Sequence, residues 1–326
     1  MIMNIKKLFL VLFITIFVFV KLVHATDNLS EALDNANKAL ANKDYDTAFD
    51  EYIRAATGED NSLAMFTLGL FFQNGWGRPI DKVEACQWFE KAAIGGIPFA
   101  AHLYGECLEN GVHCDQDYAK AAVWYEKAAE FGYDLSLCYL AELYMEGKGV
   151  PENPELAIEL CSKSAKNRSI PAQIRLGRLY LEGDEPVRDY KVAFAWFELN
   201  ALKNNPESIY YLGVMLRDGL GIPKSSEKAV HYFESAAAQG FIDAYFQTGK
   251  IYFNSRIDPE TKLLPEGFLA KSYLWLLAAS KCSTDQEEVD EAKKLLYMVR
   301  KMMPETWAPM LKKKVSDHIA KYHHAE

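Results

Sequence analysis

The sequence lacks the residue spacings that mark the common catalytic and metal sites. Its six cysteines include no Cys-x-x-Cys pair, so neither a zinc site nor a thioredoxin-like redox site of that spacing is indicated. No glycine-rich loop follows a strand-like run, which removes the usual signal for a phosphate site. One Ser-x-x-Lys occurs, from Ser225 to Lys228, but the companion motifs of the serine β-lactamases are missing. We therefore predict no catalytic, cofactor-binding or metal-binding residues.

Histidine is scarce, and three of the seven histidines, His318, His323 and His324, fall close together late in the sequence. Two adjacent histidines are a weak indication of metal binding. We expect these side chains to belong to a solvated tail instead.

Basic residues are outnumbered, with 36 Lys and Arg against 45 Asp and Glu and a net charge of −9. Three lysines fall in the first 25 residues, which contain no acid, so the remainder carries about −12. This sign of charge argues against a nucleic-acid partner, because such partners select basic surfaces. It also disfavours attraction to anionic lipid.

Long apolar runs are absent after residue 25. The one earlier run, residues 8–20, follows Lys6 and Lys7 and precedes small residues that end at Ala25. It is shorter than the roughly 20 residues that a membrane span needs. This pattern predicts a secretory signal over residues 1–25 that is cleaved after Ala25, which places the protein in the periplasm or outside the cell. A membrane anchor formed by an uncleaved signal is the alternative.

What the sequence has in abundance is repetition, with a period of 36 residues. Several columns keep one residue type from unit to unit, and such a period indicates stacked supersecondary units. Three of the columns are Gly69, Gly105, Ala141, Gly177, Gly213 and Gly249; then Gly75, Gly111, Gly147, Gly183 and Gly219; then Trp88, Trp124, Leu160, Trp196 and Tyr232.

The sequence pattern within each 36-residue repeat predicts two helices. In the first unit, one helix covers residues 62–74 and ends at a Gly-x-Gly turn that begins with Gly75. The next helix begins after Asp81, whose carboxylate can cap it. Glycine lowers helix stability by about 1 kcal/mol relative to alanine, so its recurrence at Gly69 indicates close contact with a neighbouring helix. We expect the tryptophan column, which includes Trp124, to fill the core.

The ends of the repeat array differ from its middle. Residues 27–60 predict a capping hairpin like that of the tetratricopeptide repeat, and residues 283–326 predict capping helices broken at Pro304. The third repeat departs from the pattern at Leu160 and Arg168. Between the caps we place six repeats at 61–96, 97–132, 133–168, 169–204, 205–240 and 241–282.

The pattern A…LG..Y..G.G…D…A..W(Y/F).KAA..G over about residues 60–280 resembles the Sel1-like repeat, a relative of the tetratricopeptide repeat. The resemblance implies an all-α, right-handed superhelical solenoid of antiparallel helix pairs. It also implies an adaptor or scaffold for protein complexes, often exported from bacteria and in some pathogens used in contact with host cells. A penicillin-binding or β-lactamase activity has been ascribed to some cysteine-rich relatives.

By analogy with tetratricopeptide geometry, the first helices line a concave face, and their variable positions would contact a partner. Toward the N-terminal end this face would be apolar, and Glu106, Glu109, Glu142 and Glu146 would form an acidic strip in its middle. We therefore expect a protein or peptide partner with basic residues beside an apolar anchor; a merely solvated face is the alternative. The predicted contacts are Leu63, Phe66, Leu70, Phe99, His102, Glu106, Glu109, Glu142, Met145, Glu146, Arg178, Tyr210, Arg217, Phe246 and Lys250.

Four cysteines form two candidate disulfides. Cys138 and Cys161 are each about eleven residues from the loop of their unit, so antiparallel packing would bring them to one level. Cys86 and Cys107 are similarly placed across the junction of the first two repeats. Both pairs could bridge if the side-chain directions allow it, and buried thiols are the alternative.

These observations favour an exported scaffold that binds another protein and has no catalysis of its own. One alternative is a periplasmic enzyme of the β-lactamase or penicillin-binding type. Another is a structural subunit of an envelope complex.

Overall fold

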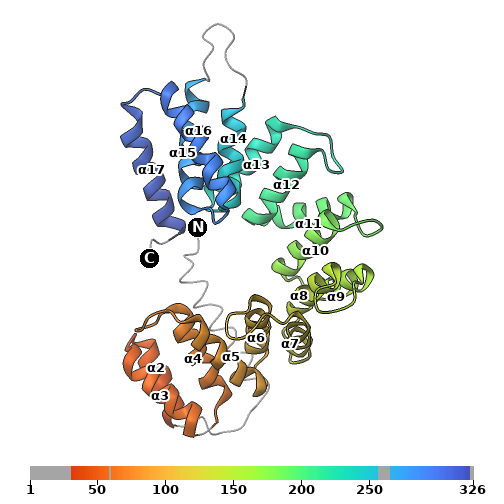
Figure 1. Cartoon of the computed structure of the whole chain (residues 1–326), viewed down its shortest axis with the longest axis vertical. Helices are drawn as coiled ribbons and strands as arrows, with labels where there is room; N and C mark the ends of the chain where they lie inside the picture. Colours follow the sequence, from red (N-terminus) through yellow and green to blue (C-terminus); the bar gives the residue numbers. More distant parts are fainter. Residues whose placement is uncertain (1–30, 59, 256–264, 324–326) are drawn as a thin grey trace. The chain divides into compact units, whose positions relative to one another are not determined.

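The computed structural model describes residues 31–58, 60–255 and 265–323, so the predicted signal lies outside the described residues. Every regular element in these ranges is an α-helix (Figure 1). None of these helices is long and apolar enough to cross a membrane. The chain divides into two compact units, unit 1 (Met1–Tyr133) and unit 2 (Asp134–Glu326).

Within each unit, helices that are consecutive in the chain pack against one another, which confirms the predicted all-α solenoid. Unit 1 contains α2 (Glu31–Ala41), α3 (Tyr45–Gly58), α4 (Ser62–Asn74), α5 (Lys82–Ile94), α6 (Pro98–Asn110) and α7 (Tyr118–Glu130). Unit 2 contains α8 (Ser136–Glu146), α9 (Pro154–Lys166), α10 (Ile170–Glu182), α11 (Tyr190–Ala201), α12 (Pro206–Asp218), α13 (Ser226–Ala238), α14 (Asp243–Phe253), α15 (Glu266–Cys282), α16 (Gln286–Met302) and α17 (Trp307–Tyr322).

Local turn chemistry sets the helix boundaries as predicted. The residue after α4, Gly75, has a φ of 65°, a left-handed conformation that glycine adopts without a Cβ clash. Gly111, Gly147 and Gly219 end their helices in the same way. Asp81 caps α5, because its Oδ1 accepts hydrogen bonds from two backbone N–H groups at 3.0 Å.

The glycine column makes the predicted close contact, but with a different aromatic column. A Cβ placed on Gly105 would lie only 2.7 Å from Cε1 of Tyr125, which is fully buried. Trp124 is half-buried, and so is Trp196, so the prediction that this column fills the core is wrong for both. Adjacent residues of a helix point about 100° apart, and only one of them can face the partner helix. The same contact recurs as Gly69 with Phe89, Gly177 with Phe197 and Gly213 with Phe233.

The third repeat replaces this contact with a disulfide. Alanine stands in the glycine column at Ala141, and Cys161 stands in the aromatic column. Cys161 bonds to Cys138 with a Cα–Cα distance of 4.2 Å, and both residues are fully buried. Departure from the pattern does not remove the second helix of this repeat, since α9 is complete and ends before Arg168, which has a φ of 62°.

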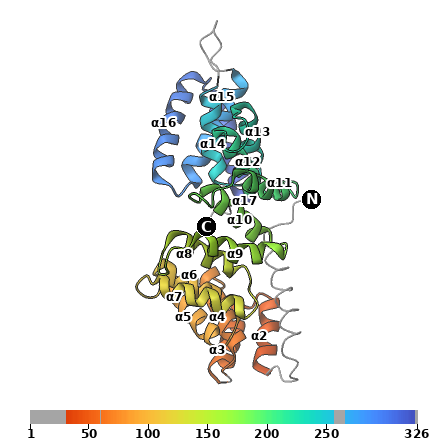
Figure 2. The same cartoon turned by 90° about the vertical axis from the view of Figure 1, so that its right-hand side faces the viewer.

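The last three helices close the C-terminal end of unit 2. Both α16 and α17 pack on α15 (Figure 1), and Figure 2 shows α16 beside α14 and α15. Pro304 stands between α16 and α17 in the sequence, as predicted. Val299 of α16 and Leu311 and Val315 of α17 are buried in the same core as Leu276 of α15. These two helices therefore cover apolar surface that the last repeat would otherwise expose to solvent.

Candidate functional site

The first helices of the repeats carry the predicted partner contacts: α4 and α6 in unit 1, and α8, α10, α12 and α14 in unit 2. We use the term first-helix face for those predicted contacts that are at least partly exposed. In unit 1 they are Leu63, Leu70, Phe99, Glu106 and Glu109; in unit 2 they are Glu142, Met145, Glu146, Arg178, Tyr210, Arg217 and Lys250.

Three predicted contacts are wrong, because Phe66, His102 and Phe246 are only 4%, 3% and 4% exposed. The Phe66 ring packs against the ring of Phe99 at a centroid distance of 6.0 Å. The His102 ring stacks on Phe99 at 5.8 Å and lies 5.5 Å from the Tyr125 ring. These side chains belong to the core between helices, so a partner could not reach them without displacing it.

In unit 1 the first-helix face combines apolar and acidic side chains. Leu63, Leu70 and Phe99 are half-buried and keep part of their apolar surface in solvent. The Glu109 carboxylate accepts a hydrogen bond of 2.5 Å from the Tyr125 hydroxyl, a neutral donor that leaves its negative charge in place. Glu106 lies 3.7 Å from Nε2 of His102.

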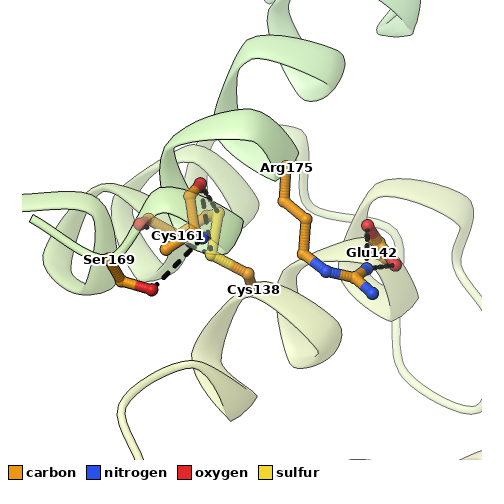
Figure 3. Close-up of a disulfide and its surroundings, with 6 residues drawn as sticks. Cys138, Glu142, Cys161, Ser169 and Arg175 are labelled. Atoms are coloured by element: carbon orange, nitrogen blue, oxygen red, sulfur yellow. Dashed lines mark hydrogen bonds and ion pairs between the residues drawn. A yellow bond between two sulfur atoms is a disulfide. The ribbon is translucent and has the colours of Figure 1, made fainter. Parts of the chain in front are cut away.

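In unit 2 the predicted acidic strip is neutralised at Glu142. Arg175, on the neighbouring first helix α10, reaches back to this carboxylate, and its Nη1 lies 2.6 Å from both oxygens (Figure 3). The same guanidinium lies 3.6 Å from the centroid of the Tyr139 ring, a cation–π contact. Glu146 is paired with Lys148. The described part of this face therefore does not present an uninterrupted negative charge.

Further along unit 2, the first-helix face consists of guanidinium groups and tyrosine rings. Arg178 pairs with Glu182 at 3.4 Å and lies 5.9 Å from the centroid of the Tyr211 ring. Burial raises the pKa of the Glu207 carboxyl, and the opposing charge of Arg178 does not cancel the shift. Burial also raises the pKa of Tyr210 to about 12, so this phenol stays protonated at neutral pH.

In the C-terminal part of the first-helix face, two more side-chain contacts join neighbouring helices. Arg217 of α12 binds the side chain of Asp218 and donates a hydrogen bond of 2.7 Å to the Gln247 amide oxygen on α14. Lys250 of α14 pairs with Glu291 of α16 at 2.9 Å. These contacts restrain the orientation of the side chains, which would lower the entropic cost of binding a partner at this face.

Sequence reasoning missed a column of the repeat that contributes to this face. Tyr139, Arg175, Tyr211 and Gln247 are spaced by 36 residues and are all half-buried in unit 2. The equivalent residues in unit 1, Thr67 and Leu103, are buried. The detectable signal was a column in register that changes residue type at every repeat, next to columns that packing holds constant.

The structure joins both candidate cysteine pairs. Cys86 and Cys107 bond across the junction of α5 and α6 with a Cα–Cα distance of 5.9 Å. Cys138 and Cys161 bond within the third repeat. Cys114, which is exposed, and Cys282, which is half-buried, are free thiols.

Two features considered in the sequence have structural roles. Ser225 precedes α13, and its Oγ accepts a hydrogen bond of 3.2 Å from the backbone N–H of Lys228, so the Ser-x-x-Lys spacing makes a helix cap. The expectation of a solvated tail is wrong for His318 and His323, which are half-buried and lie 3.0 and 2.8 Å from the Tyr245 hydroxyl. His324 lies outside the described residues.

Known proteins share this repeat. The sequence pattern described as the Sel1 repeat matches residues 62–97, 98–133, 135–169, 170–205 and 206–241, which is more than half of the chain. The protein belongs to the Sel1 repeat family. This membership fits the observed solenoid, and Sel1 repeat proteins bind other proteins.

Solved Sel1 repeat structures share the fold of the chain. It is 26% identical to c5321, described as a protective antigen of uropathogenic Escherichia coli with an SLR fold, with a TM-score of 0.62 over 89% of this chain and 57% of that one. A Sel1 repeat protein from Oxalobacter formigenes is 24% identical, with a TM-score of 0.57 over 82% of this chain and 98% of that one, and shows the fold alone.

Curated relatives are similar over part of their length. An uncharacterised Neisseria meningitidis protein is 29% identical over 60% of this chain and 40% of its own length. The rat DAP3-binding cell death enhancer 1 is 32% identical over 49% of this chain and 31% of its own length. The Sel1-repeat-containing protein YjcO of Escherichia coli is 29% identical over 59% of this chain and 84% of its own. The chain thus spans less than half of the first two relatives.

Proposed function

We propose that the protein is an exported, non-catalytic scaffold that binds a protein or peptide segment through its first-helix face. The observation that carries the proposal is the division of roles between helices. The residues that recur in most repeats are used in helix packing, as Gly105 and Tyr125 are. The half-exposed residues of the first helices change from repeat to repeat, and such positions can distinguish one partner from another.

The side chains of the first-helix face in unit 1 indicate which side chains the partner should have. Leu63, Leu70 and Phe99 offer apolar surface, and Glu109 offers a carboxylate that makes no ion pair within the described residues. A Lys or Arg beside an apolar side chain would complement both features. In unit 2, where Arg175 already holds Glu142, a partner would compete with an existing ion pair.

The setting of this scaffold is also part of the proposal. Export rests on the predicted signal over residues 1–25, and cleavage would leave Thr26 at the N-terminus. The name given to c5321, a protective antigen, supports contact between pathogen and host, and an envelope complex is the other setting we consider. N-terminal sequencing of the chain recovered from the periplasm and from the culture medium tests export. An uncleaved chain in the soluble cytoplasmic fraction would contradict it.

Affinity capture with the mature chain as bait, read by mass spectrometry, tests the binding proposal. The informative bait is E106Q/E109Q, because glutamine keeps an oxygen that can accept the Tyr125 hydrogen bond while the charge is lost. The matched control is E126Q/E130Q, which removes the same charge from exposed positions of the second helix α7. We expect only the first variant to lose the captured partner, and equal capture by both variants would contradict the proposed face.

A further inference from the structure

The C-terminal helices form a cleft that the repeats do not contribute to. Its volume is about 690 Å³, and it lies between α16 and α17. The residues that line it are Tyr297, Arg300, Lys301, Met303, Glu305, Ala308, Pro309 and Lys312. Its walls thus include three basic side chains, one acidic side chain and several apolar ones.

The charge of this region is opposite to that of the whole protein. Residues 293–323 contain eight Lys and Arg against two Asp and Glu, a net charge of +6 within a chain of −9. Arg300, Lys312, Lys313 and Lys314 are exposed and make no ion pair with any described residue. Their positive field is therefore available to an external anion, attenuated only by solvent and salt.

The cleft is suited to more than a bare anion. Tyr297 is 61% exposed, and Nζ of Lys301 lies 4.4 Å from the centroid of its ring. Met310, which follows Pro309 in the sequence, is 53% exposed. Exposed aromatic and methionine side chains are enriched where proteins bind proteins. Arg300 supplies a planar guanidinium fork that matches a carboxylate. Glu305 adds a negative charge to the lining, which disfavours a compact, doubly charged group such as phosphate more than a single carboxylate.

We infer that the cleft between α16 and α17 binds an acidic protein segment in which an apolar side chain lies beside carboxylates. Arg300 and Lys312 hold the carboxylates, and the exposed side chains of Tyr297 and Pro309 contact the apolar side chain. This surface is separate in residues and opposite in charge preference from the first-helix face, and it does not depend on the function proposed for that face. The scaffold would thereby hold two partners of different chemistry.

Fluorescence polarisation with the full mature chain tests this inference. The probe is a short fluorescein-labelled peptide in which aspartates and glutamates flank a Leu-Trp pair. The test variant is R300E/K312E, and the control is K203E/K281E, which makes the same change of charge at exposed lysines of unit 2 outside the cleft. We expect the first variant to weaken binding at least about tenfold and the control to change it much less. R300Q/K312Q provides a milder change of charge. Binding is compared only between variants whose melting temperature equals that of the wild type.

Further measurements distinguish the proposed acidic peptide from other ligands of the cleft. A peptide with Ser-Gly in place of Leu-Trp should bind more weakly, and added NaCl should weaken the binding of both peptides. Equal loss of binding in the test and control variants would overturn the inference, since it would show a general charge effect. Binding to phosphatidylglycerol vesicles without binding to the peptide would also overturn it, in favour of a lipid surface. Absence of binding to either probe would overturn it as well.

Discussion

At the residue scale, the contact between a glycine of the first helix and an aromatic ring of the second helix holds each hairpin together. Gly105 has no side chain, so the fully buried ring of Tyr125 approaches the backbone of α6 directly. Trp124, the more conspicuous residue, lies beside this contact and packs edge-on against Tyr104 with Lys127 over its ring. The pair Gly105 and Tyr125 therefore carries more of the packing energy than the neighbouring tryptophan does.

Gly105→Ala tests this assignment. In an ordinary helix the change stabilises by up to about 1 kcal/mol, but here the new Cβ would lie 2.7 Å from the Tyr125 ring. We expect a net loss of about 1–3 kcal/mol in the free energy of unfolding, typical of an overpacked core. Gly58→Ala is the control, since no atom lies within 4 Å of its Cβ position. Urea denaturation measures both, and stabilisation by Gly105→Ala would refute the close contact.

At the element scale, two helix junctions are held by disulfides and one C-terminal helix is held by histidines. The Cys86–Cys107 bridge joins α5 to α6, and the Cys138–Cys161 bridge joins α8 to α9. In the second bridge, Cys161 stands where other repeats place the aromatic ring, and Ala141 of the same repeat stands in the glycine column. A covalent bond thus replaces a packing contact in the repeat that departs most from the pattern.

Thiol counting tests both bridges. The denatured, unreduced chain should expose two thiols, Cys114 and Cys282, and the reduced chain all six. The bridges span sequence separations of 21 and 23 residues, so loop entropy predicts that each stabilises the protein by about 3 kcal/mol. Reduction should accordingly lower the melting temperature. Six reactive thiols before reduction would show that the cysteines are buried thiols.

We expect the histidine contacts to make the docking of α17 sensitive to acid. His318 faces the Tyr245 hydroxyl and the Trp275 ring, with His323 and Lys321 nearby on its own end of the chain. Burial lowers the pKa of His318 and of His323 in the folded protein. At these two sites the unfolded chain then binds more protons than the folded one, so we expect their contribution to stability to fall as the pH drops below about 6.5.

Urea unfolding at pH 7.5 and 5.5 measures this dependence. We expect His318→Gln to reduce the loss of stability at the lower pH, because one of the two perturbed groups is removed. His231→Gln, at an exposed position of α13, is the control and should behave as the wild type does. If all three proteins lost the same stability between the two pH values, the docking of α17 would not depend on the His318 proton.

At the scale of the whole molecule, the solenoid was predictable because its signals are local. Gly75 and Asp81 set helix ends through their own backbone and side-chain chemistry, and the period of 36 multiplies that information. The surfaces were less predictable. Arg175 lies 33 residues from Glu142, and only the packing of α8 beside α10 brings the two together. The cleft at α16 and α17 likewise depends on how two amphipathic helices meet on α15.

Our proposal requires that partners bind the first helices of the repeats and leave the second helices free. Hydrogen exchange of the mature chain, with and without its captured partner, tests it most directly, because α6 and α7 have equal lengths and the same repeat context. We expect the partner to slow exchange in α6, around Glu106 and Glu109, and to leave exchange in α7 unchanged. Slower exchange confined to α7, around Glu126 and Glu130, would contradict it.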